Sequence, residues 1–387
     1  MHRDNVSKTS AIRAFSYGAS LTLALLWLAP MAMASDASDG PYLKRANANG
    51  WTARWVEPMG EDLRARQKHV AAKGKVRVAA ADGVAAFEVR LRSPAVAAAD
   101  EVAKPPEAPL FVVADIHGEF GVLVELLQKQ RVVDSELAWS FGQGHLVFLG
   151  DVFDRGAYQT EALWLIYKLE GEAAKAGGSV NLLLGNHEAM VLRGDVRYLN
   201  PKYGRTAEAL GVASYSDLWG ADSVLGQWLR TRSAVLKFND LLLLHGGISP
   251  EFVERGLAPA PVNLAVREVL AGAADPAASE RHDFAMKSKG PLWYRGYFPG
   301  QDAPAEASAA EVDAILQRLG VSTILVGHTP VQRVTPLYGG KVIAVQVYPK
   351  RDAATGEAVM GAVLRDKGRW YVAGVDGTRE ALVDARP

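Results

Sequence analysis

The sequence predicts an α/β fold with a mainly parallel sheet whose strands carry polar residues at their carboxyl ends. Three apolar runs indicate buried strands, and each is followed by a polar loop and a helical pattern; these runs are residues 110–114, 145–149 and 180–184. The first polar residues after them, Asp115, Asp151 and Asn186, are 36 and 35 residues apart, which is the length of a βαβ unit. Open α/β sheets bind ligands at this edge, so we expect the three loops to form one site.

The first 34 residues predict a signal peptide. A basic start precedes an apolar run at residues 21–28, and Ala32-Met33-Ala34 fits a small-x-small cleavage site. The alternative is an N-terminal membrane anchor, but the apolar run is shorter than the ~20 residues that a spanning helix needs. We therefore expect cleavage near Ala34 and a periplasmic or secreted protein that does not stay in the membrane.

Residues 35–109 predict an accessory segment followed by a linker. Residues 75–79 and 86–92 alternate apolar with polar side chains and indicate two strands, with a turn at Asp82-Gly83 between them. Trp51 and Trp55 indicate packing against a neighbouring part of the chain, or alternatively a recognition module. Alanine and proline dominate residues 94–109, as is typical of a linker.

Residues 110–387 predict the catalytic domain. Leucines 123, 126 and 127 share one face of a helix at 122–130, and a second amphipathic helix begins at Tyr158. Residues 193–236 are helical and rich in aromatic side chains, which could line a substrate cleft or simply pack. Further strands are expected at residues 241–244, 322–326 and 341–347, with a final hairpin of residues 359–364 and 370–375.

Composition excludes several kinds of chemistry. The chain has no cysteine, so disulfides, thiolate metal sites and a cysteine nucleophile are ruled out. Lysine plus arginine and aspartate plus glutamate each number 43, so no basic excess predicts a nucleic acid or an anionic membrane as partner.

Four of the eight histidines lie at or just past a predicted strand end, beside a glycine or one residue from it: His117, His187, His245 and His328. A single buried histidine is usually a satisfied core residue. Four at equivalent positions, together with nearby Asp115, Asp151, Asp154 and Asn186, favour a shared metal site instead.

The ligands available are nitrogen and oxygen without sulfur, which suits Mn, Fe or Zn. Hydrolytic metal pairs share a bridging carboxylate, and Asp151 lies in the central motif. We assign one ion to Asp115, His117 and Asp151, and the other to Asp151, Asn186, His245 and His328.

The remaining polar residues of these loops suit catalysis and anion binding. His187 stays free of metal and could donate a proton to a leaving oxygen, with Asp154 orienting it. Arg155 and Arg295 could neutralise phosphate oxygens, although a surface ion pair is the favoured interpretation of either one taken alone.

The ordered motifs resemble the calcineurin-like metallophosphoesterases, within them the phosphoprotein phosphatase branch, and most of all the Shewanella-like protein phosphatases. They are Asp115-Ile116-His117-Gly118, Gly150-Asp151 through Asp154-Arg155-Gly156, Gly185-Asn186-His187-Glu188, His245-Gly246-Gly247 and Gly327-His328-Thr329-Pro330. Residues 226–230 and 290–296 are also similar to that subgroup. The resemblance covers residues 110–347 and implies a sandwich of two mixed sheets flanked by helices, with a dinuclear site at the strand ends.

Four positions depart from the family pattern, and none is a predicted metal ligand. Ala114 and Glu119 replace a glycine and an aspartate, Leu184 stands where eukaryotic relatives usually have an arginine, and Gln346 stands where relatives often have an aspartate.

These residues predict hydrolysis of phosphomonoesters. A metal-bridging hydroxide would attack phosphorus in line while His187 protonates the departing oxygen. The resemblance implies phosphoserine, phosphothreonine or phosphotyrosine on proteins as substrate. A dinucleoside polyphosphate hydrolase uses a similar motif set, and a non-catalytic binding domain stabilised by metal is the alternative from another class.

Overall fold

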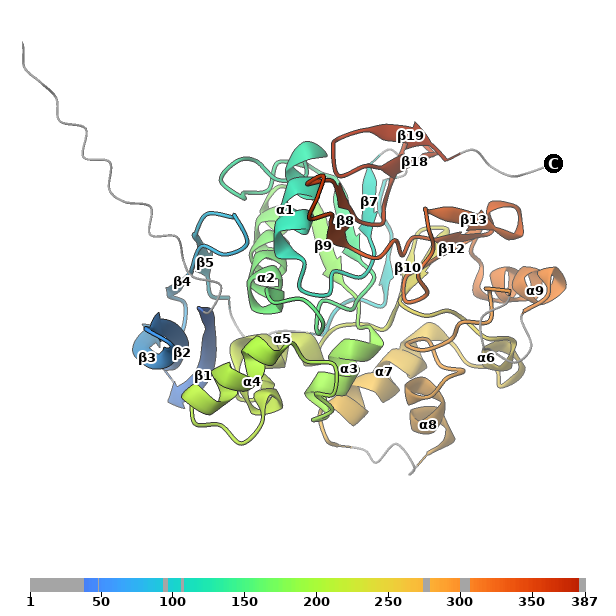
Figure 1. Cartoon of the computed structure of the whole chain (residues 1–387). Coiled ribbons are helices and arrows are strands. Elements are labelled where there is room, and N and C mark those ends of the chain that lie inside the picture. Colours follow the sequence, from blue (N-terminus) through green and yellow to red (C-terminus); the bar gives the residue numbers. More distant parts are fainter. Residues whose placement is uncertain are drawn as a thin grey trace, which may run out of the picture. The chain divides into compact units, whose positions relative to one another are not determined.

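The computed structural model describes residues 38–47, 49–92, 97–105, 108–273, 279–299 and 307–382, and the predicted signal peptide lies outside them. Two six-stranded mixed sheets pack face to face between helices (Figure 1), as the family resemblance implies. Among the described residues, no helix is both long enough and apolar enough to cross a membrane.

The first sheet contains the three strands that the βαβ spacing predicts. In spatial order its strands are β19 (Arg379–Ala381), β18 (Arg369–Ala373), β17 (Ala362–Asp366), β7 (Leu110–Val113), β8 (His145–Phe148) and β9 (Ser179–Leu182). The strands β7, β8 and β9 pair in parallel, so their carboxyl ends share one edge. The predicted C-terminal hairpin, β17 and β18, extends this sheet antiparallel to β7.

The second sheet brings the later motifs together. Its strands are, in order, β13 (Thr335–Leu337), β14 (Val342–Ala344), β12 (Thr323–Val326), β11 (Leu241–Leu244), β10 (Val235–Phe238) and β6 (Glu101–Val102). The strands β11, β12 and β14 are parallel. The prediction of a linker at residues 94–109 is wrong for β6, because its backbone pairs with β10.

The core lies in three layers, which explains why the strands are continuously apolar. Leu241 and Leu243 belong to the core between the two sheets, whereas Leu242 and Leu244 pack toward the helices. A strand covered on both faces needs apolar side chains at every position.

Helices flank the two sheets (Figure 1). The described helices are α1 (Phe120–Lys129), α2 (Gln159–Lys175), α3 (Asn186–Leu192), α4 (Pro201–Ala209), η1 (Tyr215–Trp219), α5 (Val224–Arg230), α6 (Pro250–Glu254), α7 (Pro259–Leu270), α8 (Glu280–Met286) and α9 (Ala309–Leu319), with the short turn η3 (Tyr338–Gly340). Buried side chains of α1 and α2 pack with β7 and β8, and those of α7 and α9 pack with β11 and β12.

Residues 39–90 form a three-stranded antiparallel sheet and a hairpin (Figure 1). The sheet strands are β1 (Asp39–Asn47), β2 (Gly50–Met59) and β3 (Asp62–Ala71), and the predicted hairpin is β4 (Lys75–Val78) with β5 (Phe87–Arg90). A further pair consists of β15 (Lys350–Arg351) and β16 (Ala358–Val359). The β1–β3 sheet is joined to α2, where Trp164 Nε1 donates to Pro41 O at 2.9 Å. The predicted packing residue Trp51 is buried, and Trp55 is half-buried.

Candidate metal centre and active site

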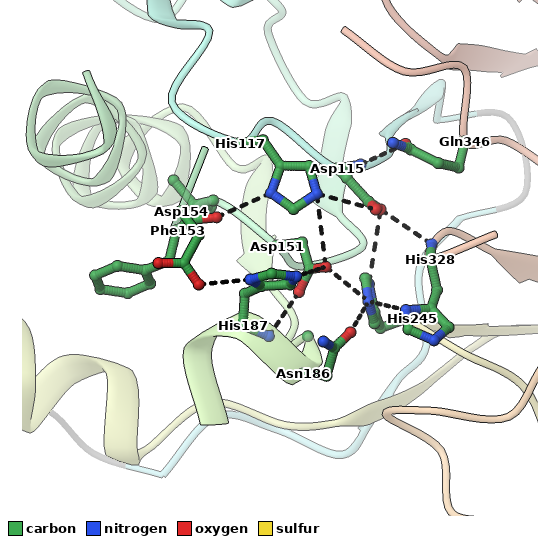
Figure 2. A network of polar contacts seen from close by, with 12 residues as sticks. Asp115, His117, Asp151, Phe153, Asp154, Asn186, His187, His245, His328 and Gln346 are labelled. Carbon is green, nitrogen blue, oxygen red and sulfur yellow. Dashed lines mark hydrogen bonds and ion pairs between the residues drawn. The ribbon is translucent and has the colours of Figure 1, made fainter. Parts of the chain in front are cut away.

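The loops at the carboxyl ends of five strands meet at one edge of the sandwich (Figure 2). Asp115 and His117 follow β7, Asp151 and Asp154 follow β8, and Asn186 and His187 open α3 after β9; His245 follows β11 and His328 follows β12. The six predicted metal ligands are all buried, with at most 5 % of each residue exposed. Residues from both sheets therefore contribute to one buried cluster.

The backbone at this edge is strained where it presents these side chains. His117, Asp151, Asp154, Arg155 and His328 all have positive φ, and they are five of the eleven such non-glycine residues in the described chain. This conformation costs free energy for side chains other than glycine, and it is concentrated at functional sites. Close approach also matters, because a Cβ on Gly185 would clash with Asp151 Oδ1.

One set of ligand atoms converges on His245 Nε2. This atom lies 2.9 Å from Asn186 Oδ1, 3.0 Å from His328 Nδ1 and 3.1 Å from Asp151 Oδ2. The other ring nitrogen, Nδ1, lies 3.0 Å from Leu149 O and can donate its hydrogen there. These four residues are the ones that the sequence assigns to one ion.

A second set of ligand atoms lies on the other side of Asp151. His117 Nε2 is 3.8 Å from Asp115 Oδ2 and 3.9 Å from Asp151 Oδ2, while its Nδ1 lies 2.9 Å from Phe153 O. Backbone carbonyls thus fix the ring orientation of both His117 and His245 and turn Nε2 toward the cluster. Asp151 Oδ2 lies between the two sets, where a bridging carboxylate is expected.

Two groups of three buried side chains could each hold an ion, because their ligand atoms lie within 4.8 Å of one another. They are His117, Asp151 and His187, and Asp151, His245 and His328. The second group lies within the predicted ligand set. The first contains His187 where the sequence assigns Asp115, so geometry alone allows His187 either role.

The pKa shifts of two of the site's histidines suit metal binding. Burial lowers the pKa of His117 to about 4 and also lowers the pKa of His328, so both rings are neutral at pH 7 with a lone pair to offer. Burial lowers the pKa of His245 as well, but the Asp151 and Asp115 carboxylates outweigh it and raise that pKa to about 9. The positively charged form of the His245 ring is therefore favoured beside the oxygens of Asp151 and Asn186.

The donor chemistry of these residues fits a metal ion. The atoms that meet in the cluster are buried imidazole nitrogens, carboxylate oxygens and an amide oxygen, with no sulfur among them. This donor set suits the predicted ions Mn, Fe and Zn. His328 contributes Nδ1, and its other ring nitrogen, Nε2, is buried without a hydrogen-bond partner.

His187 and Asp154 form a tight pair at the side of the cluster. His187 Nδ1 lies 2.5 Å from Asp154 Oδ2, and Asp154 is fully buried. Burial lowers the pKa of His187, but the carboxylates of Asp151 and Asp154 outweigh it and raise that pKa above its ordinary value. The pair therefore favours a protonated ring, as a proton donor requires.

Glu188 is a site residue to which the sequence assigned no role. Its carboxylate accepts hydrogen bonds from the backbone N–H groups of Gly185, Asp151, Val152 and Phe153, at 2.7, 2.8, 2.7 and 3.3 Å. It thus fixes the loop after β8 against the start of α3. A glutamate three residues after the N-cap residue, here Gly185, is a capping signal in the sequence, but that signal does not reveal the contact with the other loop.

Gln346, one of the departures from the family pattern, supports the first loop. Its Oε1 accepts a hydrogen bond from Asp115 N at 3.0 Å. The Asp115 carboxylate in turn accepts from His328 N at 3.1 Å, so the loops of the two sheets are joined here.

The two predicted anion-binding arginines lie at the rim. Arg155 is exposed, and its guanidinium carbon lies 5.9 Å and 5.8 Å from the ring centres of Tyr198 and Tyr348. Arg295 is half-buried and donates to His328 O at 3.1 Å and to Thr329 Oγ1 at 3.2 Å. Within the described part of the chain, no carboxylate forms an ion pair with either arginine, which disfavours the surface ion-pair alternative.

Two tyrosines extend the site outward. Tyr198 lies against His187, with ring centres 5.4 Å apart, and Tyr348 stacks on His117 at 5.9 Å. They are 49 % and 37 % exposed and belong to the few large apolar side chains on the described surface. We call Tyr198 and Tyr348 the aromatic rim. Because Tyr198 belongs to residues 193–236, that segment contributes to the candidate site as well as to packing.

Comparisons with known proteins identify the family that this chain resembles. Residues 108–332 match the family described as calcineurin-like phosphoesterase. A protein of Schizosaccharomyces pombe is 30% identical over 232 residues, which cover 57% of this chain and 67% of the relative. Shewanella-like protein phosphatase 2 of Arabidopsis thaliana is 24% identical over 303 residues, covering 67% and 76%.

A solved structure extends the likeness beyond the family match. The crystal structure of a cold-active protein-tyrosine phosphatase of a psychrophilic Shewanella species is 36% identical, with a TM-score of 0.76, and the alignment covers 89% of this chain and 99% of that one. The likeness therefore extends into residues 35–109, which the sequence placed outside the resemblance.

Proposed function

The chain belongs to the calcineurin-like phosphoesterase family, and from that premise we propose that it hydrolyses phosphomonoesters on proteins, with phosphotyrosine as the favoured residue. One observation carries the proposal: five buried nitrogen and oxygen ligands gather around a sixth, Asp151, with the His187–Asp154 pair beside them and two arginines at the rim. The phosphatase relatives and this donor set support a metal-dependent hydrolase.

Two metal ions would be held by the residues that the sequence assigns, with Asp151 shared. When bound, such ions activate water and neutralise charge on the transferring phosphoryl group. A donor set of nitrogen and oxygen without sulfur supports Mn, Fe or Zn.

The chain's own side chains would supply the proton and hold the phosphate. His187 points its Nε2 into the cluster, 3.9 Å from Asp151 Oδ2, and protonates the departing oxygen. Asp154 holds the opposite ring nitrogen and favours the charged imidazole. Arg155 and Arg295 have no carboxylate partner among the described residues and hold the phosphoryl oxygens.

The aromatic rim supports phosphotyrosine over phosphoserine. A phenyl ring entering with its phosphate at Arg155 can pack between Tyr198 and Tyr348, whereas a serine side chain is too short to reach them. The similar Shewanella protein is a protein-tyrosine phosphatase, which supports the same substrate.

A panel of phosphoesters tests this function. Purified protein reloaded with Mn, Fe or Zn is assayed on phosphotyrosine and phosphoserine peptides and on a dinucleoside polyphosphate. We expect hydrolysis of the phosphopeptides, fastest with phosphotyrosine. Preference for the dinucleotide would indicate the rival hydrolase, and no turnover with two metals bound would indicate the non-catalytic domain.

The His187→Asn variant tests the proton donor. Turnover of a phosphotyrosine peptide should fall by about 10²-fold or more, because general acid catalysis contributes a factor of that size. Metal content should stay at the wild-type level, since His187 is not a ligand in this assignment. Loss of one metal together with activity would instead move His187 into the ligand set.

A further inference from the structure

We propose that the β1–β3 sheet positions the catalytic acid through a chain of buried hydrogen bonds, in which Tyr42, Tyr215 and Gln159 are positioning residues. The chain runs from Asp39 to Asp154, although β1–β3 lies outside residues 108–332 of the family match. The inference rests on the proposed role of His187 as the proton donor.

The first hydrogen bond of the chain holds Asp154, the partner of His187. Asp154 has a positive φ of 70°, so its backbone needs a partner to keep this conformation. Its N–H donates to Gln159 Oε1 at 2.6 Å, and both residues are fully buried. Because Asp154 Oδ2 lies 2.5 Å from His187 Nδ1, a shift of Asp154 moves the His187 ring.

The second step sets the direction of the Gln159 amide. Its Nε2 donates to the Tyr215 hydroxyl oxygen at 2.7 Å, and its backbone N–H donates to the Tyr203 hydroxyl at 2.8 Å. If the amide flipped, its NH₂ group would face the Asp154 N–H, and two donors would oppose each other. The Tyr215 oxygen therefore keeps Gln159 Oε1 toward Asp154.

The third step links these residues to the β1–β3 sheet. The Tyr42 hydroxyl donates to Asp39 Oδ2 at 2.6 Å, and its oxygen lies 3.3 Å from that of Tyr215 and 3.1 Å from Thr160 Oγ1. The 2.6 Å bond to the Asp39 carboxylate holds the Tyr42 hydroxyl in place, and the contact between the Tyr42 and Tyr215 hydroxyls is the next hydrogen bond of the chain. Buried hydrogen bonds that follow one another in this way strengthen one another.

The two tyrosines keep their protons under all physiological conditions. Burial raises the pKa of both well above the ordinary value, and the Asp39 carboxylate is the next cause. Neither hydroxyl can therefore leave the chain by ionising.

The experiment uses substrates that depend on the acid to different degrees. Full-length Tyr42→Phe and Tyr215→Phe proteins are assayed on a series of phenyl phosphates, from nitrophenol to unsubstituted phenol as leaving group. A good leaving group needs little help from His187, whereas a poor one needs its proton. We expect the variants to lose roughly 3- to 10-fold on phenyl phosphate and less than about 2-fold on nitrophenyl phosphate, a partial loss of the acid's contribution.

The matched control is Tyr167→Phe. Tyr167 is also buried on α2, and its hydroxyl accepts a hydrogen bond from Arg92 N at 3.0 Å, but it is outside the chain to Asp154. This variant should keep the wild-type dependence on the leaving group. Metal content and thermal unfolding are measured for each protein, and Asp39→Asn, which keeps the side-chain shape, is a second route if Tyr42→Phe does not fold.

The outcomes separate this inference from the proposed function. The positioning role would be overturned if Tyr42→Phe and Tyr215→Phe lost activity equally on all the phenyl phosphates. It would also be overturned if Tyr167→Phe showed the same change in leaving-group dependence. If His187→Asn itself shows the wild-type leaving-group dependence, His187 is not the acid and the proposed function is revised first. Both the positioning role and the proposed function are supported if His187→Asn, Tyr42→Phe and Tyr215→Phe depend more steeply on the leaving group than the wild type and Tyr167→Phe does not.

Discussion

Glu188 shows how one side chain can support an active site although it is not itself assigned to a metal ion or to the substrate. Four backbone N–H groups from two loops converge on its carboxylate, which is fully buried. A carboxylate has enough lone pairs to accept all four, and no neutral side chain of the same size does. The loop carrying Asp151 therefore depends on the charge of Glu188 as well as on its shape.

Replacing Glu188 with Gln should destabilise the protein by about 2–4 kcal/mol, because the amide NH₂ would face N–H groups and leave buried donors unpaired. We also expect weaker metal binding, since Asp151 loses its support. Chemical denaturation and metal titration measure the two effects. The exposed Glu136→Gln is the control, and equal stability of both variants would contradict this role of Glu188.

The aromatic rim gives a second prediction at the residue scale. Replacing Tyr198 and Tyr348 with Ala should lower kcat/KM for a phosphotyrosine peptide by roughly 2- to 10-fold per tyrosine, the range expected for an aromatic contact. The value for a phosphoserine peptide should change less. Leu264→Ala, an exposed apolar residue on α7, should leave both unchanged. An equal loss on both peptides would mean that the rim does not select the substrate.

At the scale of the element, α2 joins the active site to the β1–β3 sheet. Gln159 at its start belongs to the chain that holds Asp154, and Glu161 in its first turn faces a cavity of about 320 Å³ lined also by Asp39 and Trp55. Glu161 Oε2 is buried without a hydrogen-bond partner. Leaving a carboxylate in this position costs free energy, so the acid is favoured in its neutral form.

This environment predicts a pH dependence of stability. Burial raises the pKa of Glu161 to about 8, with Lys202 opposing and Asp39 adding to the shift. The folded state thus binds this proton more tightly than the unfolded chain, so the stabilisation is complete below pH ~4 and is lost as the pH rises toward 8. Each unit of difference corresponds to about 1.4 kcal/mol.

Glu161→Gln should remove this dependence, because the amide resembles the neutral acid and cannot ionise. We expect the variant and the wild type to have similar free energies of unfolding near pH 5 and the variant to be more stable at pH 8. Denaturation at both values measures the difference, with Glu136→Gln again as the control. A gap that stays constant between the two pH values would contradict the shifted pKa.

At the scale of the whole molecule, the site joins the two sheets of the sandwich. Asp115, Asp151 and Asn186 come from loops of the first sheet, and His245 and His328 from loops of the second. Direct contacts already cross between them, since His245 Nδ1 lies 3.0 Å from Leu149 O and Asp115 accepts from His328 N. Ions held by both sets would therefore stabilise the sandwich itself.

Removing metal with a chelator should lower the melting temperature, and adding Mn, Fe or Zn should restore it. Each ion present at 100 times its Kd stabilises the folded state by about 2.7 kcal/mol. His187→Asn should show the full wild-type drop on chelation, and Asp151→Asn a smaller one. A melting temperature that does not respond to chelation in the wild type would exclude this stabilising role.

Much of the fold was predictable because its signals are local. Three apolar runs with loops at a regular spacing predicted β7, β8 and β9, and the run of four leucines predicted β11 within its observed bounds. The β1–β3 sheet was not predicted, because β3 is largely exposed and polar and has no apolar alternation to reveal it. Strand β6 was missed because two residues in an alanine- and proline-rich stretch carry no periodic signal.

The sequence by itself determined which side chains stand at strand ends and that they offer nitrogen and oxygen ligands, because these properties depend on neighbours along the chain. Only the tertiary structure decided three contacts: the Asp115 carboxylate with the His328 N–H of the other sheet, the Glu188 carboxylate with the loop after β8, and Tyr42 with Asp154 through Tyr215 and Gln159. These contacts join residues far apart in the sequence and depend on strand order, register and the packing of α2, and no local pattern of residues encodes those distances.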